Sequence, residues 1–405
     1  MSDAQEGPKT GKVSSTAGIA AFLLLSVAVI GLAYIAYLKT RDLDLKDLSF
    51  GEIIRGRFLS AEAETGKKEV YRFTYDPKEH PAFVMDGGLL VKCSRGLVKC
   101  LDRKGSEQWS VQVSVENPIA RASGQSLLVA DQGGKEIYVI DGGRVKWEKK
   151  LNSNIINIDI SETGYVSVIH ESEGYKGAVS VLDYRGNILF TRFIGENYPI
   201  VAKVSPSGKT VALASVDTSG VESNTSLEYT DMSGKPFAKV TVNNMIIPSM
   251  WFVDDESLIC AGNSALMCFD KSMRKKWEQD FNEGDITGAA YILGRYVAVA
   301  AQGEGSNGIF NGADGNTAIK VFGINGKQMS SASVQGRVKR MESYSDRIAV
   351  YTGRTVYFTD LRGRIVGSFS SQSEIIKVFF YDKQEAAVIT KSEVIAASVG
   401  GNGSR

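Results

Sequence analysis

Hydrophobic residues follow two different patterns along this chain. An unbroken run of uncharged, largely apolar residues occupies positions 17–38. Beyond residue 69, short runs of β-branched and aromatic residues alternate with clusters of Gly, Asn, Asp and Ser, and no apolar stripe with helical spacing is evident. Such runs are typical of β-strands joined by turns. The pattern therefore predicts one helix near the N-terminus and then a domain made almost entirely of strands.

The apolar run at 17–38 is long enough to cross a membrane. A helix of this length rises about 33 Å, and the hydrocarbon core of a bilayer is about 30 Å thick. We predict a short polar tail at 1–16, a transmembrane helix at 17–38 and a juxtamembrane linker at 39–68. A cleaved signal peptide is the alternative, although its apolar core is usually only about 7 to 15 residues long. Basic residues flank the run on both sides, so they do not fix its orientation.

An internal repeat sets the architecture of the strand-rich part. Apolar strands that end in Asp or Gly recur at a mean spacing of 43 residues, and a glycine follows most of them within a few positions. The seven anchors are Asp102, Asp141, Asp183, Asp231, Asp270, Gly323 and Asp360. A period of about 40 to 45 residues is typical of the four-stranded blades of a β-propeller. Asp and Gly are also the residues that turns require, so each anchor is predicted to be structural.

A large aromatic residue follows four of the anchors by six or seven positions. These residues are Trp109, Trp147, Phe190 and Trp277. The repeat places them on the outer strands, where a ring can fill the space between neighbouring blades. A ligand site lined by tryptophan is the alternative, but outer strands lie far from the axis of a propeller.

The two ends of the repeat region decide the number of blades. Inner strands begin near Ala82, Ile119, Ile156, Ile200, Pro248, Ile286, Val338 and Ile375. The last copy stops near Val399 without an outer strand, whereas the strand at 69–75 has no blade of its own. If that strand completes the last blade, the ring closes and its exposed edges disappear. We predict a propeller of eight blades at 69–399, with seven as the alternative, and a disordered tail at 400–405.

Two stretches resemble known propeller families. The segment LDRKGSEQW, at residues 101–109, resembles the repeat of quinoprotein-type (PQQ-like) propellers, and VSPSGKTVALAS, at residues 204–215, is similar to WD40 and TolB-like blades. A single N-terminal membrane segment followed by a propeller also resembles uncharacterised bacterial envelope families. The resemblance implies the fold. It implies no single function, because these families include dehydrogenases, scaffolds and binding modules.

Composition and charge narrow the functional classes. The chain has 47 Lys and Arg against 46 Asp and Glu, so nothing favours a nucleic-acid partner. His80 and His170 are its only histidines, which leaves little for a triad or a His-rich metal site, and we expect no catalytic, metal or cofactor residues. Asp314 lies in a loop with oxygen ligands that suit calcium, but the loop lacks the full EF-hand pattern.

Four cysteines form two pairs at equivalent positions of the repeat. Cys93 and Cys100 flank one predicted hairpin turn, and Cys260 and Cys268 flank another. If the partners lie directly opposite each other, their spacing suits a disulfide. Disulfides imply an oxidising exterior and hence an extracytoplasmic propeller on a single-pass membrane protein. The alternative is two pairs of buried thiols inside the cell.

Long loops at one end of the ring predict a binding face. Tyr175 and Phe310 are the aromatic residues in the long loops of blades three and six, so we predict that they contact a partner. The favoured function is a membrane-anchored, non-catalytic interaction or scaffold module for other membrane or envelope proteins. A quinone-dependent dehydrogenase or hydrolase and a glycan or ligand sensor are the alternatives. The other explanation of the long loops is that they are insertions that bind no partner and are tolerated because they cost little stability.

Overall fold

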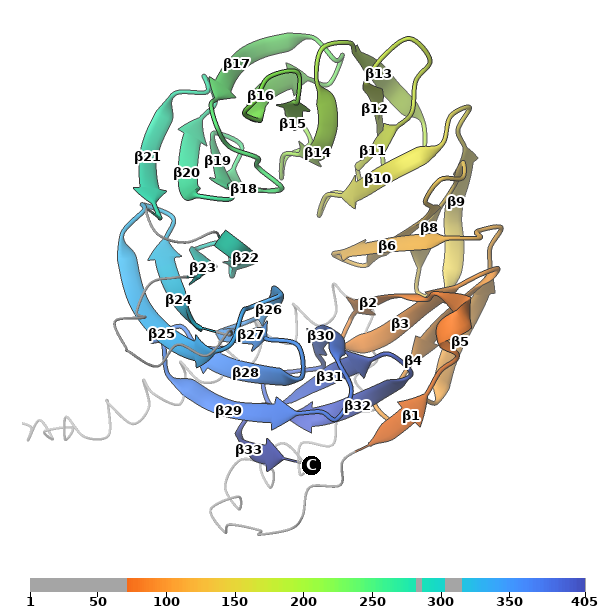
Figure 1. The fold of residues 1–405 in the computed structure, drawn as a ribbon. Coiled ribbons are helices and arrows are strands. Elements are labelled where there is room, and N and C mark those ends of the chain that lie inside the picture. The colour runs from red at the N-terminus through yellow and green to blue at the C-terminus, as the bar shows by residue number, and fades with distance from the viewer. Residues whose placement is uncertain (1–70, 282–285, 303–314, 405) are drawn as a thin grey trace, which may run out of the picture. The chain divides into compact units, whose positions relative to one another are not determined.

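The strands of the repeat region are arranged as eight antiparallel sheets around a central channel (Figure 1). A computed structural model of the chain describes residues 71–281, 286–302 and 315–404. In the part that it describes, no helix has the length and apolar character needed to span a bilayer. The segments predicted at 1–16, 17–38 and 39–68 lie outside the described residues. The prediction of an eight-bladed, all-β propeller is confirmed.

Each blade runs from an inner strand at the channel to an outer strand at the rim. The first four blades are β2 (Ala82–Asp86), β3 (Leu89–Ser94), β4 (Leu97–Leu101) and β5 (Glu107–Gln112); β6 (Pro118–Ser123), β7 (Ser126–Asp131), β8 (Glu136–Asp141) and β9 (Arg144–Lys150); β10 (Ile155–Ile160), β11 (Val166–His170), β12 (Gly177–Leu182) and β13 (Ile188–Ile194); and β14 (Tyr198–Val204), β15 (Thr210–Asp217), β16 (Asn224–Asp231) and β17 (Pro236–Val242).

The remaining blades follow the same order. They are β18 (Ser249–Asp254), β19 (Ser257–Ala261), β20 (Ala265–Asp270) and β21 (Lys275–Asp280); β22 (Ile286–Ile292), β23 (Tyr296–Gln302), β24 (Asn316–Gly323) and β25 (Gln328–Gln335); β26 (Arg340–Tyr344), β27 (Arg347–Tyr351), β28 (Thr355–Asp360) and β29 (Ile365–Ser370); and β30 (Ile375–Phe380), β31 (Glu385–Thr390) and β32 (Glu393–Ser398) with β1 (Arg72–Thr74). A short 3-10 helix, η2 (Pro77–Glu79), connects β1 to blade one.

The ring closes as predicted, because the strand near residues 69–75 completes the last blade. β1 pairs with β32 in antiparallel register, so the last blade combines residues from both ends of the described chain. Arg103 of blade one reinforces the joint, because its guanidinium donates to Asp382 at 2.6 Å and to Glu385 at 2.8 Å in blade eight. The segment predicted as a disordered tail at 400–405 contains one further strand. β33 (Gly401–Ser404) runs parallel to β29 and adds a fifth strand to blade seven.

Five of the Asp anchors form the outer turns of their blades, as predicted. Asp183 is representative, since its Oδ1 accepts hydrogen bonds from the backbone N–H groups of Arg185 and Asn187, both at 2.9 Å. The same pair of bonds recurs at Asp102, Asp231, Asp270 and Asp360. A side-chain oxygen that satisfies two turn N–H groups explains why Asp occupies the anchor in most copies.

Neighbouring blades meet where an aromatic ring lies on a turn glycine. A Cβ added at the glycine would come within 2.6 to 2.8 Å of a ring atom, so only glycine leaves room for the ring. The pairs are Trp109 on Gly143, Trp147 on Gly186, Phe190 on Gly234, Trp277 on Gly326 and Phe73 on Gly105. Trp147 and Trp277 also donate from Nε1 to backbone carbonyls of the next blade, at 3.1 and 2.9 Å. The prediction that these rings fill the space between blades is confirmed.

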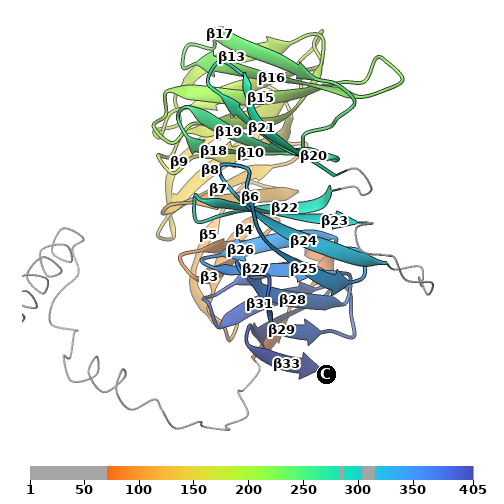
Figure 2. The ribbon, with the colours of Figure 1, turned by 90° about the vertical axis from the view of Figure 1, so that its left-hand side faces the viewer.

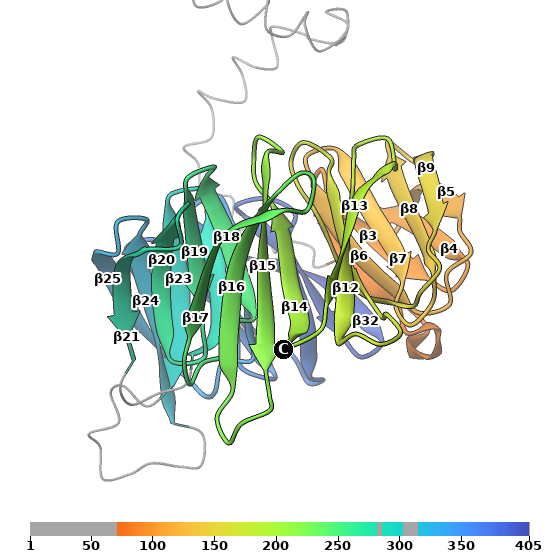
Figure 3. The same cartoon turned by 90° about the horizontal axis from the view of Figure 1, so that it is seen from above.

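The connections define two faces of the ring. Turns between first and second strands, and between third and fourth, lie at one end, which we call the hairpin face. Connections between second and third strands, and from one blade to the next, lie at the other end, which we call the loop face. In Figure 2 the long β15–β16 connection projects from the loop face at the right, and in Figure 3 it projects downwards. The loop face therefore collects the variable segments of all the blades.

The glycine contact generates a prediction about stability. Gly186 has a φ of +86° and lies against the Trp147 ring, whereas Gly133 has a similar φ of +81° and no atom within 4 Å of an added Cβ. We expect Gly133→Ala to lower the free energy of unfolding by about 1 to 2 kcal/mol, because the left-handed backbone disfavours a side chain. Gly186→Ala should lower it by about a further 1 to 3 kcal/mol, because the methyl group displaces the ring. Chemical denaturation of both variants measures the difference, and equal losses would show that the ring contributes nothing.

Closure of the ring generates a second prediction. Deleting residues 71–76 from the full chain should open blade eight, expose the edge of β32 and cause aggregation in size-exclusion chromatography. Deleting residues 401–404 is the matched control, because β33 adds to a blade that already has four strands. That variant should stay monodisperse and melt close to the parent temperature. A monodisperse 71–76 deletion with the parent melting temperature would refute closure by β1.

Candidate functional site

The loop face carries a cluster of exposed aromatic side chains between blades three and four. Tyr175 is 51% exposed, Phe193 is 53% exposed and Tyr198 is 45% exposed. The rings of Tyr175 and Phe193 contact each other, with their centroids 5.1 Å apart. The Lys176 ammonium lies 4.8 Å from the centroid of the Tyr198 ring and 3.3 Å from its hydroxyl. We call these four residues the aromatic patch.

Local backbone contacts hold the aromatic patch in place. The N–H of Tyr175 donates to the carbonyl of Ser172 at 3.2 Å, which closes a turn that includes Gly174 at a φ of +76°. The N–H of Lys176 donates to the carbonyl of Ile194 at 2.8 Å and so ties the loop to the outer strand. A long loop is thus fixed to the rim of its own blade, and its aromatic residue is held outward.

A polar pocket of about 500 Å³ adjoins the aromatic patch. Its lining includes Lys135 from blade two, and Glu171, Glu173, Tyr175 and Lys176 from blade three. Its lining includes both positive and negative side chains, so it offers hydrogen-bond donors and acceptors next to exposed rings. This combination of apolar rings and a polar rim is typical of protein-binding surfaces.

The structure describes only one of the two residues predicted to contact a partner. Tyr175 lies in the aromatic patch, whereas Phe310 lies outside the described residues. Asp314, predicted as a weak calcium ligand, also lies outside them. Phe193 and Tyr198 were not predicted as partner residues, because they lie near the end of one strand and at the start of the next. The signal available for them was a pair of aromatic residues on either side of the short GEN segment at residues 195–197.

The predicted opposition of the cysteine pairs is wrong. Cys93 lies opposite Val98 and is therefore diagonal to Cys100, because the two-residue turn is formed by Arg95 and Gly96 rather than by the next pair along the chain. All four cysteines are free and buried.

The second cysteine pair departs further from the prediction. Cys260 lies opposite Met267, and Cys268 lies opposite Ile259. Cys260 and Cys268 are thus one register position apart, and side chains alternate between the faces of a sheet, so the two thiols point to opposite faces. They pack into different hydrophobic clusters. The disulfide argument for an extracytoplasmic propeller therefore no longer stands.

His170 lies within a buried hydrogen-bonding network. His170 is buried at the end of β11, where its Nδ1 lies 2.9 Å from the carbonyl oxygen of Glu171 and its Nε2 lies 2.8 Å from Ser180 Oγ. A carbonyl only accepts, so Nδ1 carries the proton and Nε2 accepts from the hydroxyl of Ser180 in the neutral ring. Ser180 is only 2% exposed, so no substrate reaches this pair. His80 lies on the loop face and lines a pocket described below.

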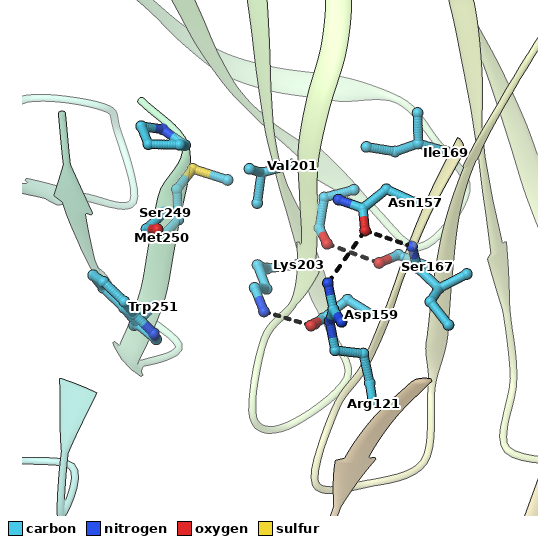
Figure 4. A pocket seen from close by; sticks show the side chains of 13 residues that line it. Arg121, Asn157, Asp159, Ser167, Ile169, Val201, Lys203, Ser249, Met250 and Trp251 are labelled. Atoms are coloured by element: carbon cyan, nitrogen blue, oxygen red, sulfur yellow. Dashed lines mark hydrogen bonds and ion pairs between the residues drawn. The ribbon is translucent and has the colours of Figure 1, made fainter. Parts of the chain in front are cut away.

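The inner strands place charged side chains in the channel wall. Asp159 on β10 accepts a hydrogen bond from the ammonium group of Lys203 on β14. Arg121 on β6 reaches the Oδ1 of Asn157 at 3.5 Å (Figure 4). Burial raises the pKa of Asp159, and the positive charge of Lys203 opposes that shift. A cavity of about 130 Å³ lies among these residues, bordered on the far side by Trp251.

A metal site needs several donor side chains close together. Across residues 71–281, 286–302 and 315–404, no group of three or more His, Cys, Asp or Glu side chains is close enough together to hold a metal ion.

Comparisons with known proteins agree with the fold. Residues 71–397 match the model of a family described as a family of unknown function (DUF5711). BamB from Moraxella catarrhalis is similar in structure, with a TM-score of 0.51 and 13% identity over 80% of this chain and 98% of that one. Saccharomyces cerevisiae Sqt1 gives a TM-score of 0.56 and 10% identity over 76% and 92% of the two chains.

A third solved structure and the curated sequences complete the comparison. The Dos1 propeller gives a TM-score of 0.51 and 14% identity over 79% of this chain and 78% of that one. No curated protein sequence matches this chain. Identities this low support the β-propeller fold and carry no activity to this chain. The resemblance to quinoprotein repeats remains a prediction.

The buried thiols generate a prediction about alkylation. Burial raises the pKa of Cys93 to about 12 and the pKa of Cys100 and Cys268 to about 11, so almost no reactive thiolate forms at pH 8. We expect intact-mass spectrometry to find the native chain largely unmodified by iodoacetamide. After denaturation without a reductant, the same chain should gain four alkyl groups. A gain of two or none would indicate disulfides and refute the free thiols.

Proposed function

The chain belongs to a family of unknown function (DUF5711), and we propose that its propeller is a non-catalytic protein-interaction module held at a membrane by the segment at 17–38. The observation that carries the proposal is the aromatic patch on the loop face. Its three rings are about half exposed and lie on a rigid scaffold. Aromatic residues are enriched among the residues that contribute most to binding between proteins, because they bury a large area at little cost in conformational entropy.

The architecture supports binding rather than catalysis. The closed ring fixes the loops of neighbouring blades relative to one another, so a partner meets a surface that is already ordered before it binds. The His170–Ser180 pair is enclosed, and the channel charges include no histidine or cysteine among the residues of the Asp159–Lys203 cavity. An enzyme with a propeller fold remains the alternative.

The proposed partner is a membrane or envelope protein that presents apolar side chains to the aromatic patch. Tyr175 and Phe193 would receive an apolar side chain, while Lys176 and the carboxylate groups of Glu171 and Glu173 would contact the polar rim around it. An anchor at 17–38 supports this class of partner, because it would hold the propeller close to membrane proteins and raise their effective concentration.

Substitution of the aromatic patch tests the proposal. We expect Tyr175→Ala and Phe193→Ala each to weaken partner binding by about 1 to 2 kcal/mol, since each removes a half-exposed ring while leaving the buried core intact. The measurement is quantitative capture from solubilised native membranes on the full chain, with the captured proteins identified by mass spectrometry and their affinities then measured with the purified partner.

Phe237→Ala is the matched control for this experiment. Phe237 is 52% exposed and lies at the start of the outer strand of blade four, near the hairpin face. It is therefore as exposed as Phe193 but lies on the other face of the ring. We expect Phe237→Ala to retain every partner lost by the patch variants. Equal capture by the parent and by a Tyr175→Ala, Phe193→Ala double variant would exclude the aromatic patch as the binding site.

A further inference from the structure

A second pocket, separate from the aromatic patch, opens on the loop face where the ring closes. It has a volume of about 480 Å³ and is lined by blades eight, one and two. This volume falls in the range of about 300 to 1,000 Å³ that is usual for small-molecule sites. The lining includes Arg121, Lys377, Lys391 and His80, and it includes no carboxylate. The pocket is therefore positive in character, although the chain as a whole carries a net charge of only +1.

The cations in this pocket have no carboxylate partners. Lys377 on β30 donates to the carbonyl of Phe83 at 3.3 Å, and its ammonium lies 4.5 Å from the centroid of the Phe379 ring. Arg121 donates to the carbonyl of Ala120 at 3.0 Å. Both sets of contacts are with neutral groups. Among the described residues, no carboxylate lies within ion-pair distance of Lys377, Arg121 or Lys391.

The nearest carboxylates do not balance this charge. Glu342 on β26 is the acidic group whose field acts on Lys377, and Arg340 of the same strand offsets it. Asp159 acts on Arg121 from β10 but is already paired with Lys203. Burial and the charges of Arg121 and Arg340 lower the pKa of Lys377, while Glu342 opposes the shift. Lys377 is thus a partly buried cation with no carboxylate at ion-pair distance, so an anion in the pocket would lower the energy of the site.

Part of the pocket wall is apolar. Tyr75 and Phe83 meet edge to face, with their ring centroids 5.0 Å apart. The side chains of Ile119, Ile376 and Ile389 extend this wall, and Ile376 is 51% exposed. Aromatic and aliphatic side chains beside a few placed charges are typical of pockets that bind small organic molecules.

We infer that this pocket binds a small organic anion, in which a carboxylate or phosphate group is attached to an aromatic or aliphatic group. The guanidinium of Arg121 and the ammonium groups of Lys377 and Lys391 contact the acidic group, because guanidinium and ammonium donors are the usual partners of both. The rings of Tyr75 and Phe83 contact its apolar part. The inference does not depend on the proposed partner, since the two sites share no residue.

Calorimetric titration of the full chain with phenyl phosphate at low salt tests this inference. Phenyl phosphate carries both halves of the expected ligand, while phenol and inorganic phosphate each carry one. We expect phenyl phosphate to bind and each of the other two probes to bind at least about tenfold more weakly, since each lacks one set of contacts. Arg121→Gln and Lys377→Met should each weaken phenyl phosphate binding by about tenfold or more, because each removes a charged donor.

Arg95→Gln is the control, because Arg95 lies on the loop face but pairs with Glu116 and is not among the residues that line this pocket. Its affinity for phenyl phosphate should equal that of the parent. Arg121 is exposed, so Arg121→Gln keeps the test valid even if Lys377→Met lowers stability. The absence of phenyl phosphate binding at concentrations up to about 10 mM would overturn the inference. Unchanged affinity in both variants, or equal binding of inorganic phosphate, would also overturn it.

Discussion

The contact between an outer-strand ring and a turn glycine of the next blade is the constraint on which this ring depends. A four-stranded blade cannot bury its own outer turn, and the ring of its neighbour covers that turn only where no side chain intervenes. Five blade junctions use this contact, including the junction of Phe73 with Gly105 that joins the two ends of the described chain. At Gly363 the close neighbour is instead the backbone carbonyl of Ser331. The angle between blades is thus set at the rim, and the width of the channel follows from it.

The sequence was most informative where a residue has a backbone reason to recur. Asp183 and its counterparts satisfy turn N–H groups, and this requirement repeats in five blades, so the period could be read from the chain, and with it the closure by β1. The register of the first cysteine hairpin could not be read from the chain, because a two-residue turn fits two adjacent positions in SRGLVK equally well. Moving that turn by one residue moves Cys100 from directly opposite Cys93 to a diagonal position.

The candidate sites were less predictable for a related reason. Tyr175 stood out as an aromatic residue in a long loop, but its contact with Phe193 depends on how two strand ends converge. The channel charges gave a fainter signal, a single ionisable residue within an otherwise apolar inner strand, as in PIARAS at residues 118–123 and IINIDI at residues 155–160. Which of these charges share one pocket is a property of the closed ring, because Arg121 and Lys377 are more than half the chain apart.

The closing strand also determines how the ring responds to mechanical load. Tension applied to the chain ahead of Tyr71 enters the propeller through β1, which has only three residues and runs from the hairpin face towards the loop face. Such a pull acts along the strand and shears its short ladder with β32, whereas each strand from β2 to β32 connects directly along the chain to a neighbouring strand of the same blade. Loss of β1 would also withdraw Tyr75 from the pocket at the joint. The ring therefore has one joint that yields first under force, and that joint borders a cavity lined by cations.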